Sequence, residues 1–460
     1  MGAVGVTRPA AAPAGAGEVK PAALPLASAA FHKKLATRPG FAIGYAGTLL
    51  FVLMYCSRPN ELLGMPFFPF AQIAAVFALG GFLPALVMKP AEVFPGLKEM
   101  KYLVFLFLHL CLAVPFSIWP GGSYERVFEE MSKVVLISLC IPAVVNTLPR
   151  LRWMLRVQTV PVAIMVLISA SGSGKVLVNS AGQIRMRGQV GGVFENPNDY
   201  AFAIALVFPV AVCFLLRSRN LFGKVFWGVT SLAMVYVVFQ TLSRGGLLAL
   251  AVAALAIAWE FGFRQKRFAL LAVFALSSVA LVGAAPSAFM ERVASIVDFT
   301  KDETGSGWAR RALLQKSIDT AFANPLFGVG PGNFQIFSGD WHGAHNTYTQ
   351  LGSEAGLPAA LFFILLLFGG IFKTRRLRLD SADPELRLLA TALNASLTCY
   401  AVGAFFADTA YHFFPYLLVA YAASLHQISL RMNRENAGPE KTDTKAVGRF
   451  QSARHLAGTS

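Results

Sequence analysis

Two histidines stand three positions apart in the stretch GDWHGAHNTYTQLGSEAGLP, residues 339–358, which leads directly into the apolar run AALFFILLLFGG. The ordinary pKa of histidine suits proton transfer near neutral pH, so His342 and His345 are candidates for a general base. A histidine at a membrane interface that only forms hydrogen bonds is the plainer alternative. Together with Asp340 these side chains are also possible metal ligands, but a zinc site needs three or four ligands at matched spacing, and we predict no metal.

Arginines occur in three further polar segments: RMRGQVGGVFENPNDYA at 185–201, TLSRGG at 241–246 and WARRALLQKSIDTAFANPLFGVGPGNFQ at 308–335. The planar guanidinium group binds phosphate oxygens bidentately and stays charged near lipid, so such arginines are typical of a site for an anion. Each segment also has a simpler interpretation: a helix start at NPND, an arginine reaching the membrane interface, and an amphipathic surface helix. The candidate arginines are Arg187, Arg244, Arg310 and Arg311.

The elements that must position these side chains are membrane helices. Of 460 residues, 55% are hydrophobic and only 14% are charged, whereas soluble domains carry about 25% charged residues. The apolar residues form repeated runs of about 20 residues, the length that crosses a bilayer. We therefore predict an all-α polytopic membrane protein with about 12 transmembrane helices, near 41–57, 66–88, 101–119, 128–147, 153–170, 198–216, 223–241, 245–262, 268–286, 356–373, 388–407 and 411–430.

The distribution of charge predicts the orientation of these helices. Basic connections such as HKKLATR, PRLRWMLR, RSRNLFGK and KTRRLRL occur at every second loop, and such loops lie in the cytoplasm, which puts both termini inside. The net charge of +16 is thereby explained without nucleic acid, and membrane lipids are the expected surroundings. Residues 171–197 and 287–355 are outer segments that nevertheless carry basic residues, which an anionic ligand would explain. The five cysteines lie in or at the ends of apolar runs without a CxxC pair, so no disulfide or metal framework is predicted.

The chain divides by composition. We expect one or two short amphipathic helices in the long outer segment, with Leu314, Ile318 and Ala321 on one face and a cleft between this segment and the bundle. The predicted organisation is a flexible cytoplasmic tail at 1–35, transmembrane helices 1–9 at 36–286, a long periplasmic catalytic loop at 287–355, transmembrane helices 10–12 at 356–430 and a disordered cytoplasmic tail at 431–460.

Taken in order, these motifs resemble the O-antigen ligase and O-antigen polymerase superfamily of bacterial envelope glycan transferases. GGVFENPNDYA is similar to the family's G-x-F-x-N-P-N-x-x-A segment, and SRGG is similar to its Ser-Arg-Gly segment. NPLFGVGPGNF followed by HNTYTQLGSEAGLP resembles its G-V-G and H-N-x-y motifs, with Arg310 matching the arginine that precedes them. Asn324 replaces the usual histidine of the family's hHP motif, and Leu314 stands where a tryptophan is frequent.

The resemblance implies a fold similar to the C-type glycosyltransferases (GT-C) in the bacterial inner membrane, with the site on the periplasmic face. It implies transfer of a glycan from undecaprenyl diphosphate to an acceptor hydroxyl, with inversion and without metal or cofactor. Arg187, Arg244 and Arg310 or Arg311 would converge on the diphosphate, and Asn346 could orient substrate. His345 would take the proton of the acceptor hydroxyl, and His342 would be dispensable.

The acceptor is open: lipid A-core, a growing polymer in a repeat-unit polymerase, or the hydroxyl of a protein side chain. The alternative of a different class is a lipid flippase or polysaccharide transporter. Transporters place ionisable residues at the membrane midplane and are built from repeated halves. Here the predicted spans are nearly free of charge at their centres and show no convincing repeat, which favours an enzyme.

Overall fold

The structure is a computed structural model that describes residues 41–65, 69–88, 90–178, 182–264, 306–340 and 342–436, with four isolated positions between 265 and 305. The tail predicted at 1–35 and most of the span predicted at 268–286 lie outside the described residues. The described chain is mostly helical. Its α-helices are α2 (Phe41–Ser57), α3 (Pro59–Leu62), α4 (Phe70–Met88), α5 (Pro90–Glu99), α6 (Lys101–Ala113), α7 (Pro120–Tyr124), α8 (Ser132–Val144), α9 (Leu148–Ile168), α10 (Pro197–Arg217), α11 (Leu221–Gln240), α12 (Arg244–Ile257), α15 (Ser306–Ala323), α16 (Phe334–Ser338), α17 (Thr347–Ala355), α18 (Leu357–Asp380), α19 (Pro384–Gly403) and α20 (Phe413–Asn436).

Among the described residues, eight helices are long and apolar enough to cross a membrane: α4, α9, α10, α11, α12, α18, α19 and α20 with their short helical extensions. This confirms an α-helical polytopic membrane protein. The spans predicted at 41–57 and 101–119 form shorter apolar helices. The span predicted at 128–147 belongs to a longer helical segment, α7 to α8, whose middle part Glu125–Met131 is a charged π-helix. At the C-terminus, α20 continues to Asn436, beyond the predicted boundary at 430.

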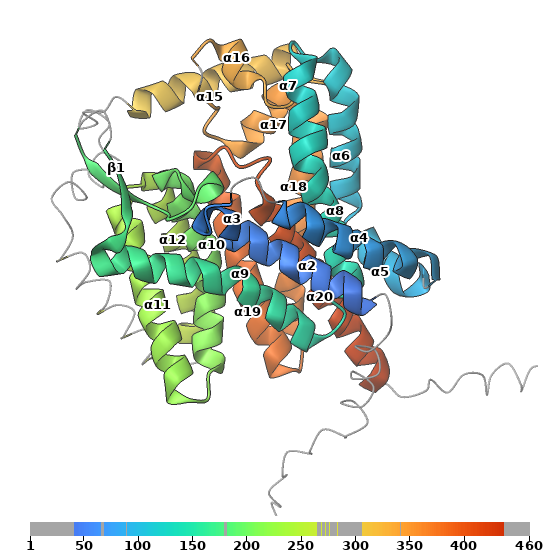
Figure 1. Cartoon of the computed structure of the whole chain (residues 1–460), viewed down its shortest axis with the longest axis vertical. Helices are drawn as coiled ribbons and strands as arrows, with labels where there is room; N and C mark the ends of the chain where they lie inside the picture. Colours follow the sequence, from blue (N-terminus) through green and yellow to red (C-terminus); the bar gives the residue numbers. More distant parts are fainter. Residues whose placement is uncertain are drawn as a thin grey trace, which may run out of the picture. The chain divides into compact units, whose positions relative to one another are not determined.

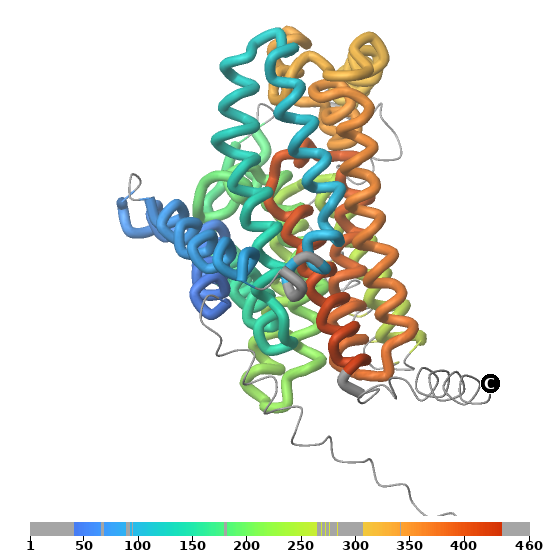
Figure 2. Tube along the Cα trace, turned by 90° about the vertical axis from the view of Figure 1, so that its right-hand side faces the viewer, coloured from blue at the N-terminus to red at the C-terminus, as the bar shows by residue number. Residues whose placement is uncertain are grey.

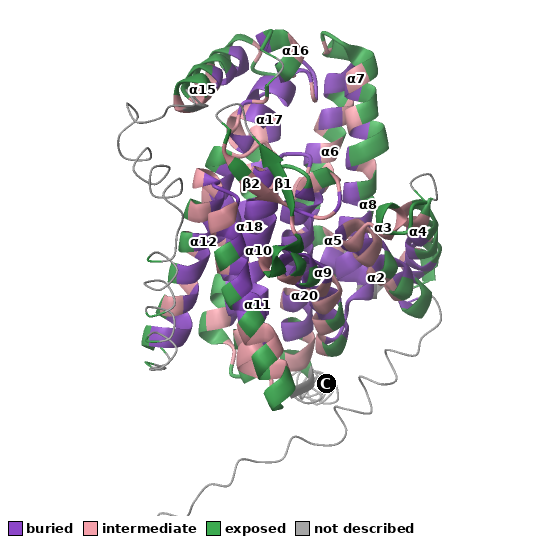
Figure 3. Ribbon diagram, turned by 60° about the vertical axis from the view of Figure 1, so that its left-hand side comes forward, coloured by how far each residue is buried: buried purple, intermediate pink, exposed green. Residues whose placement is uncertain are grey.

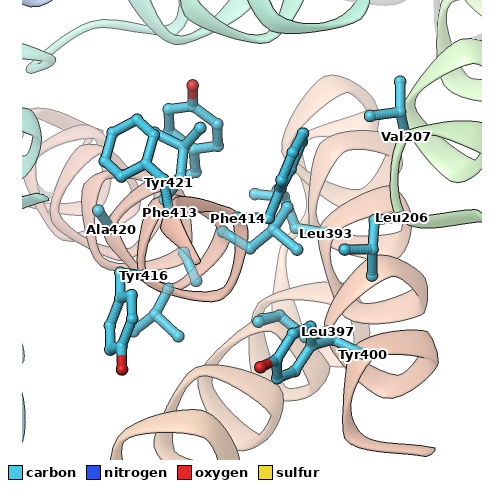
Figure 4. Packing of buried hydrophobic residues seen from close by; sticks show 14 of the residues in the cluster. Leu206, Val207, Leu393, Leu397, Tyr400, Phe413, Phe414, Tyr416, Ala420 and Tyr421 are labelled. Carbon is cyan, nitrogen blue, oxygen red and sulfur yellow. The ribbon is translucent and has the colours of Figure 1, made fainter. Parts of the chain in front are cut away.

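The centre of the bundle is formed by α10, α19 and α20. In the most apolar 18-residue stretch of each helix, 83% of the residues are buried in α10, 72% in α19 and 83% in α20. The corresponding values are 28% for α4 and 33% for α18. Their side chains interlock through aromatic rings such as Tyr400, Phe413 and Tyr416, which are all fully buried (Figure 4). The outer helices instead expose large apolar side chains, and their exposed residues are green in Figure 3. Apolar side chains facing outward are expected where the surrounding solvent is lipid.

Ion pairs tie the basic ends of the helices together. Glu385 at the start of α19 pairs with Arg217 at the end of α10 (3.3 Å) and with Arg152 on α9 (3.1 Å). Glu260 pairs with Arg378 at the end of α18 (3.5 Å). The basic connections within the described residues, PRLRWMLR, RSRNLFGK and KTRRLRL, therefore lie at one end of the bundle, opposite the end that carries α15, α16 and α17 (Figures 1 and 2).

One part of the fold is not helical, so the all-α prediction was incomplete. Strands β1 (Lys175–Val178) and β2 (Ile184–Arg187) form an antiparallel hairpin in which Lys175 pairs with Arg187. In IRMR, basic and apolar residues alternate, which is the period of a strand. The pattern is too short to stand out among long apolar runs.

At the other end, α15, α16 and α17 pack beside the tip of the hairpin formed by α6 and α7 (Figure 1). The Ile118 N–H of this tip donates to the Val329 carbonyl (3.0 Å), and the Ser123 hydroxyl donates to the Pro331 carbonyl (2.9 Å). These bonds hold the glycine-rich turn between α15 and α16. Helix α18 then runs from α17 along the length of the bundle (Figure 2).

The buried face of α15 differs from the predicted one. Leu313, Ser317 and Thr320 are buried together with Ala321, whereas Leu314 and Ile318 are only partly covered. The Ser317 hydroxyl donates to Thr349 Oγ1 on α17 (2.8 Å). The face of α15 that packs on α17 therefore combines small polar and apolar residues, because a hydrogen bond between the two helices takes the place of a continuous apolar stripe.

Candidate active site

A cavity of about 450 Å³ lies at the α15–α17 end of the bundle. It brings together predicted site residues from three separate stretches of the chain: Arg244, Arg310, Arg311, His345 and Asn346. The rest of its lining is mostly apolar or glycine, and it includes no carboxylate among the described residues; this remainder is Gly245, Leu248, Gly307, Trp308, Leu314, Ala344, Phe405 and Phe406. A concave apolar site with a few convergent polar groups is the usual form of a ligand site.

The SRGG segment positions Arg244 at the first residue of α12. The Ser243 hydroxyl caps the helix by accepting the Gly246 N–H (3.2 Å). A Cβ at Gly246 would lie 2.4 Å from the Cβ of Ala201 on α10, so only glycine lets the two helices approach this closely. Arg244 is thus held at the cavity by a capped helix start that is packed against the centre of the bundle.

Helix α15 supplies Arg310 and Arg311, and the glycine-rich turn behind it is held by α17. Glu354, buried in α17, accepts the Gly332 N–H through Oε2 (3.0 Å), and its carbonyl accepts the Gly330 N–H (2.8 Å). Burial raises the pKa of the Glu354 carboxyl to about 7, against the opposing influence of Tyr411 and Arg126. Because α15 packs on the same helix, the arginines are placed by a rigid unit.

His345 has an unusual backbone. Its φ is +51°, a left-handed conformation that costs a non-glycine residue energy and is concentrated at functional sites. The neighbouring Gly343 packs directly on Asp408, because a Cβ there would lie 2.2 Å from Asp408 Oδ2. This tight turn brings His345 Nδ1 to 3.3 Å from the same carboxylate oxygen.

The electrostatics of this pair fit a neutral histidine beside an anion. Burial, followed by the positive charge of Arg310, lowers the pKa of His345 to about 4, so the ring is neutral at pH 7. Burial raises the pKa of Asp408 to about 6, although the backbone N–H groups of His345 and Asn346 and the charge of Arg310 oppose that rise. A carboxylate beside Nδ1 favours the tautomer with the proton on Nδ1, which leaves Nε2 as the proton acceptor.

Asn346 lines the cavity but also has a structural role. Its Oδ1 accepts the N–H groups of Tyr348 (3.0 Å) and Thr349 (3.1 Å) and so caps α17. The next residue, Thr347, donates to the Ala407 carbonyl (2.7 Å) and accepts the Thr409 N–H (3.1 Å). Thr347 therefore bonds to the residues on either side of Asp408, and these bonds hold the segment that carries His345 against the segment that carries Asp408.

Arg187 is the predicted site residue that does not line this cavity. Its guanidinium pairs with Glu195 (3.4 Å), an exposed residue of its own loop. Two positions earlier, Arg185 donates to Asn198 Oδ1 (2.7 Å) and to the Thr241 carbonyl (2.8 Å), just before the SRGG segment. Arg244 and the pair on α15 therefore line one cavity and Arg187 lies outside its lining, and the binding of a diphosphate by these arginines stays a prediction.

The two histidines of the opening stretch are placed differently. His342 is exposed, and its Nδ1 lies 2.6 Å from the Asp340 carbonyl outside the cavity lining. The described residues contain no group of three or more His, Cys, Asp or Glu side chains arranged for a metal ion. Metal independence stays a prediction.

Asp408 is the site residue that sequence reasoning missed. It lies in ADTAYHFF, a connection identified as an outer loop but not as part of the site. An acidic residue on an outer connection next to two membrane helices was the available signal. Asp199 in the NPND segment was missed in the same way, and it lies within electrostatic reach of Asp408 and Arg310.

These observations define a multi-pass helical membrane protein with an arginine-lined cavity that contains a histidine at one end. Residues 229–364, from α11 to α18, match the family model described as O-antigen ligase, which supports an O-antigen ligase-like family and confirms the predicted resemblance. The match includes Arg244, Arg310, Arg311 and His345, whereas Arg187 precedes it. A search of curated proteins gives no match. The family implies a membrane glycan transferase of the ligase or polymerase type.

Proposed function

We propose that this protein transfers a glycan from undecaprenyl diphosphate to an acceptor hydroxyl at the periplasmic face of the bacterial inner membrane. The observation that carries the proposal is the cavity in which Arg244, Arg310 and Arg311 face the same space as His345. Three guanidinium groups without a lining carboxylate suit a diphosphate, and the apolar remainder suits a ligand that arrives from lipid. The family match supports the same chemistry.

In the proposed reaction, the acceptor oxygen attacks the anomeric carbon of the donor sugar. The bond between that carbon and the diphosphate oxygen breaks, and its electron pair leaves with undecaprenyl diphosphate. The arginines stabilise the charge that develops on the leaving group. A single displacement of this kind inverts the anomeric configuration.

His345 takes the proton of the attacking hydroxyl through Nε2, and Asp408 stabilises the imidazolium that forms. The low pKa of His345 bears on this proton transfer. Arg310 is one cause of the low value, and a bound diphosphate offsets the charge of that arginine. Donor binding is therefore expected to raise the pKa of His345 toward the range in which a general base works best.

Three activities share this donor chemistry and differ only in the acceptor: a ligase acting on lipid A-core, a repeat-unit polymerase, and a transferase to protein hydroxyls. The direct test uses the purified protein in nanodiscs with a defined undecaprenyl diphosphate-linked glycan and each acceptor in turn. Transfer with release of undecaprenyl diphosphate, and an inverted linkage by NMR, is the expected result. Movement of the intact donor across a bilayer, with no transfer to any of the three acceptors, would show a flippase instead.

A further inference from the structure

A second and larger cavity, of about 710 Å³, lies between helices α2 and α4 on one side and the π-helical part of α7–α8 on the other. The start of α20 and the loop at Gly192 and Val193 complete its wall. None of its lining residues is shared with the first cavity. The sequence analysis assigned no site to these residues.

The two cavities differ in charge. The second one is lined by the cations Arg58, Arg126 and Lys133, and also by the carboxylates Glu129 and Glu130. Two of its cations are paired: Arg58 contacts Glu61 (2.8 Å), and Arg126 contacts Glu130. A lining with both signs of charge offers donors and acceptors in similar number, which suits a ligand of many hydroxyl groups better than a diphosphate.

The remaining lining combines aromatic side chains with amide groups. Tyr55 and Phe413 meet edge to face with ring centroids 4.9 Å apart, and Phe51 packs on the same Phe413 ring at 5.7 Å. Asn60 and Gln72 add planar amides. Amides and carboxylates bind the hydroxyl groups of a sugar, and the aromatic side chains give this part of the wall an apolar surface.

The second cavity adjoins the segment that carries Asp408. Tyr411, His412 and Phe413 line the second cavity, and Phe405 and Phe406, on the other side of Asp408 in sequence, line the first. A small void lined by Asp199, Thr409 and His412 borders the second cavity through His412. Asp199 in turn lies within electrostatic reach of Asp408 and Arg310.

We propose that the second cavity binds the saccharide head of the acceptor, a lipid-anchored glycan whose lipid lies against α4. Helix α4 exposes Ile73, Val76 and Phe77, an apolar surface on which an acyl chain can lie beside the cavity. The assignment of acceptor rests on the proposed function. In this assignment the arginine-lined first cavity binds the donor diphosphate. The second cavity, with charges of both signs and aromatic side chains, binds the sugars that receive the glycan.

The experiment uses the full-length protein in nanodiscs without donor, so that no turnover is required. The probe is rough lipopolysaccharide, lipid A with its core oligosaccharide, carrying a photoactivatable diazirine on the core sugars. Labelling is expected on peptides that contain the start of α4 and Glu129. Ala71→Trp fills the cavity and should lower labelling about tenfold, and Val87→Trp, at the far end of the same helix and outside both the lining and the proposed lipid surface, should leave it unchanged.

Two further arms keep the result interpretable. Glu129→Gln preserves shape and should weaken labelling severalfold, and Glu125→Gln, an exposed carboxylate nearby, is its matched control. Retention of undecaprenyl diphosphate should be the same in all four variants. Labelling confined to the first cavity, or labelling that Ala71→Trp does not reduce, overturns the proposal. A protein that labels as expected but never transfers glycan overturns the proposed function alone.

Discussion

The two cavities are lined by side chains of different chemistry, although both take part of their lining from residues 405–413. The first gathers Arg244, Arg310 and Arg311 with His345, and none of the described residues that line it is a carboxylate. The second opposes its cations with Glu129 and Glu130 and surrounds them with aromatic rings. Phe405 and Phe406 line the first cavity, Tyr411, His412 and Phe413 line the second, and Asp408, next to His345, lies between these two groups in the sequence.

The difference teaches that charge balance, rather than the number of charges, separates the two sites. The three arginines that line the first cavity attract an anion, and the charge of Arg310 lowers the pKa of the nearby His345. Paired charges cancel at a distance and act mainly through hydrogen bonds. A transferase with two lipid-linked substrates needs both kinds of surface, so variants in each cavity should affect different substrates.

The largest effect is expected from His345→Ala. Removal of a general base costs about 10²- to 10⁴-fold in rate, while the arginines still hold the diphosphate. Transfer from a purified lipid-linked glycan should therefore be nearly abolished, with donor binding retained in a parallel binding assay. His342→Ala is the control and should keep substantial activity. Near wild-type transfer by His345→Ala, or equal loss in His342→Ala with inhibition by EDTA, would refute the assignment.

Arg310→Ala should lower transfer by about 10²- to 10³-fold, the usual cost of a group that stabilises developing negative charge. Donor binding should weaken in the same variant, in contrast to His345→Ala. Arg310→Lys should recover little, since the ammonium group lacks the planar fork. Full recovery with lysine would reduce the role of this residue to net charge. Titration by NMR should also show a raised His345 pKa in Arg310→Ala, because one cause of the low value is gone.

Asp408→Asn should lower kcat by about 10- to 100-fold, since a hydrogen bond to a charged partner contributes about 1.5–3 kcal/mol. The pH profile distinguishes this role from a structural one. The Asp408 carboxyl has a pKa of about 6, so it loses its charge as the pH falls, and the wild-type rate should decline below about pH 6 as charged Asp408 is lost. Among the described residues, the charged and titratable groups that face it are His345, Arg310, Asp199 and Glu354. An unchanged acidic limb in Asp408→Asn would remove this residue from the mechanism.

The smallest effect is expected from Arg187→Ala. The sequence alone predicts a large loss at this position, but the structure pairs Arg187 with the exposed Glu195 outside the cavity. Exposed ion pairs contribute only about 0–1 kcal/mol, so activity should fall by less than about fivefold. The measurement is the transfer rate of Arg187→Ala in the same assay, compared with that of Arg310→Ala. A loss as large as that of Arg310→Ala would place Arg187 on the substrate and extend the first cavity toward the β-hairpin.

Much of the fold was predictable because a bilayer demands it. Apolar runs of membrane-spanning length have to form helices, since the backbone has no water to bond with. Each predicted span outside 268–286 overlaps a helical segment. The short hairpin at Lys175–Arg187 escaped because its alternation is brief, and the buried face of α15 was misplaced by one position because small polar residues form its contact with α17.

The sequence by itself determined the chemistry available: a histidine at the top of a span, arginines on outer segments, and the order of motifs that indicates the family. Those inferences depend on residue type and local spacing, which a sequence displays. Only the tertiary structure decided which of these side chains meet. The pairing of His345 with Asp408, the exclusion of Arg187 from the first cavity and the mixed-charge cavity beside α4 all depend on contacts between segments far apart in the chain. Such contacts follow from how helices pack, and the period of apolar residues indicates which face of a helix is buried but not which other helix it contacts.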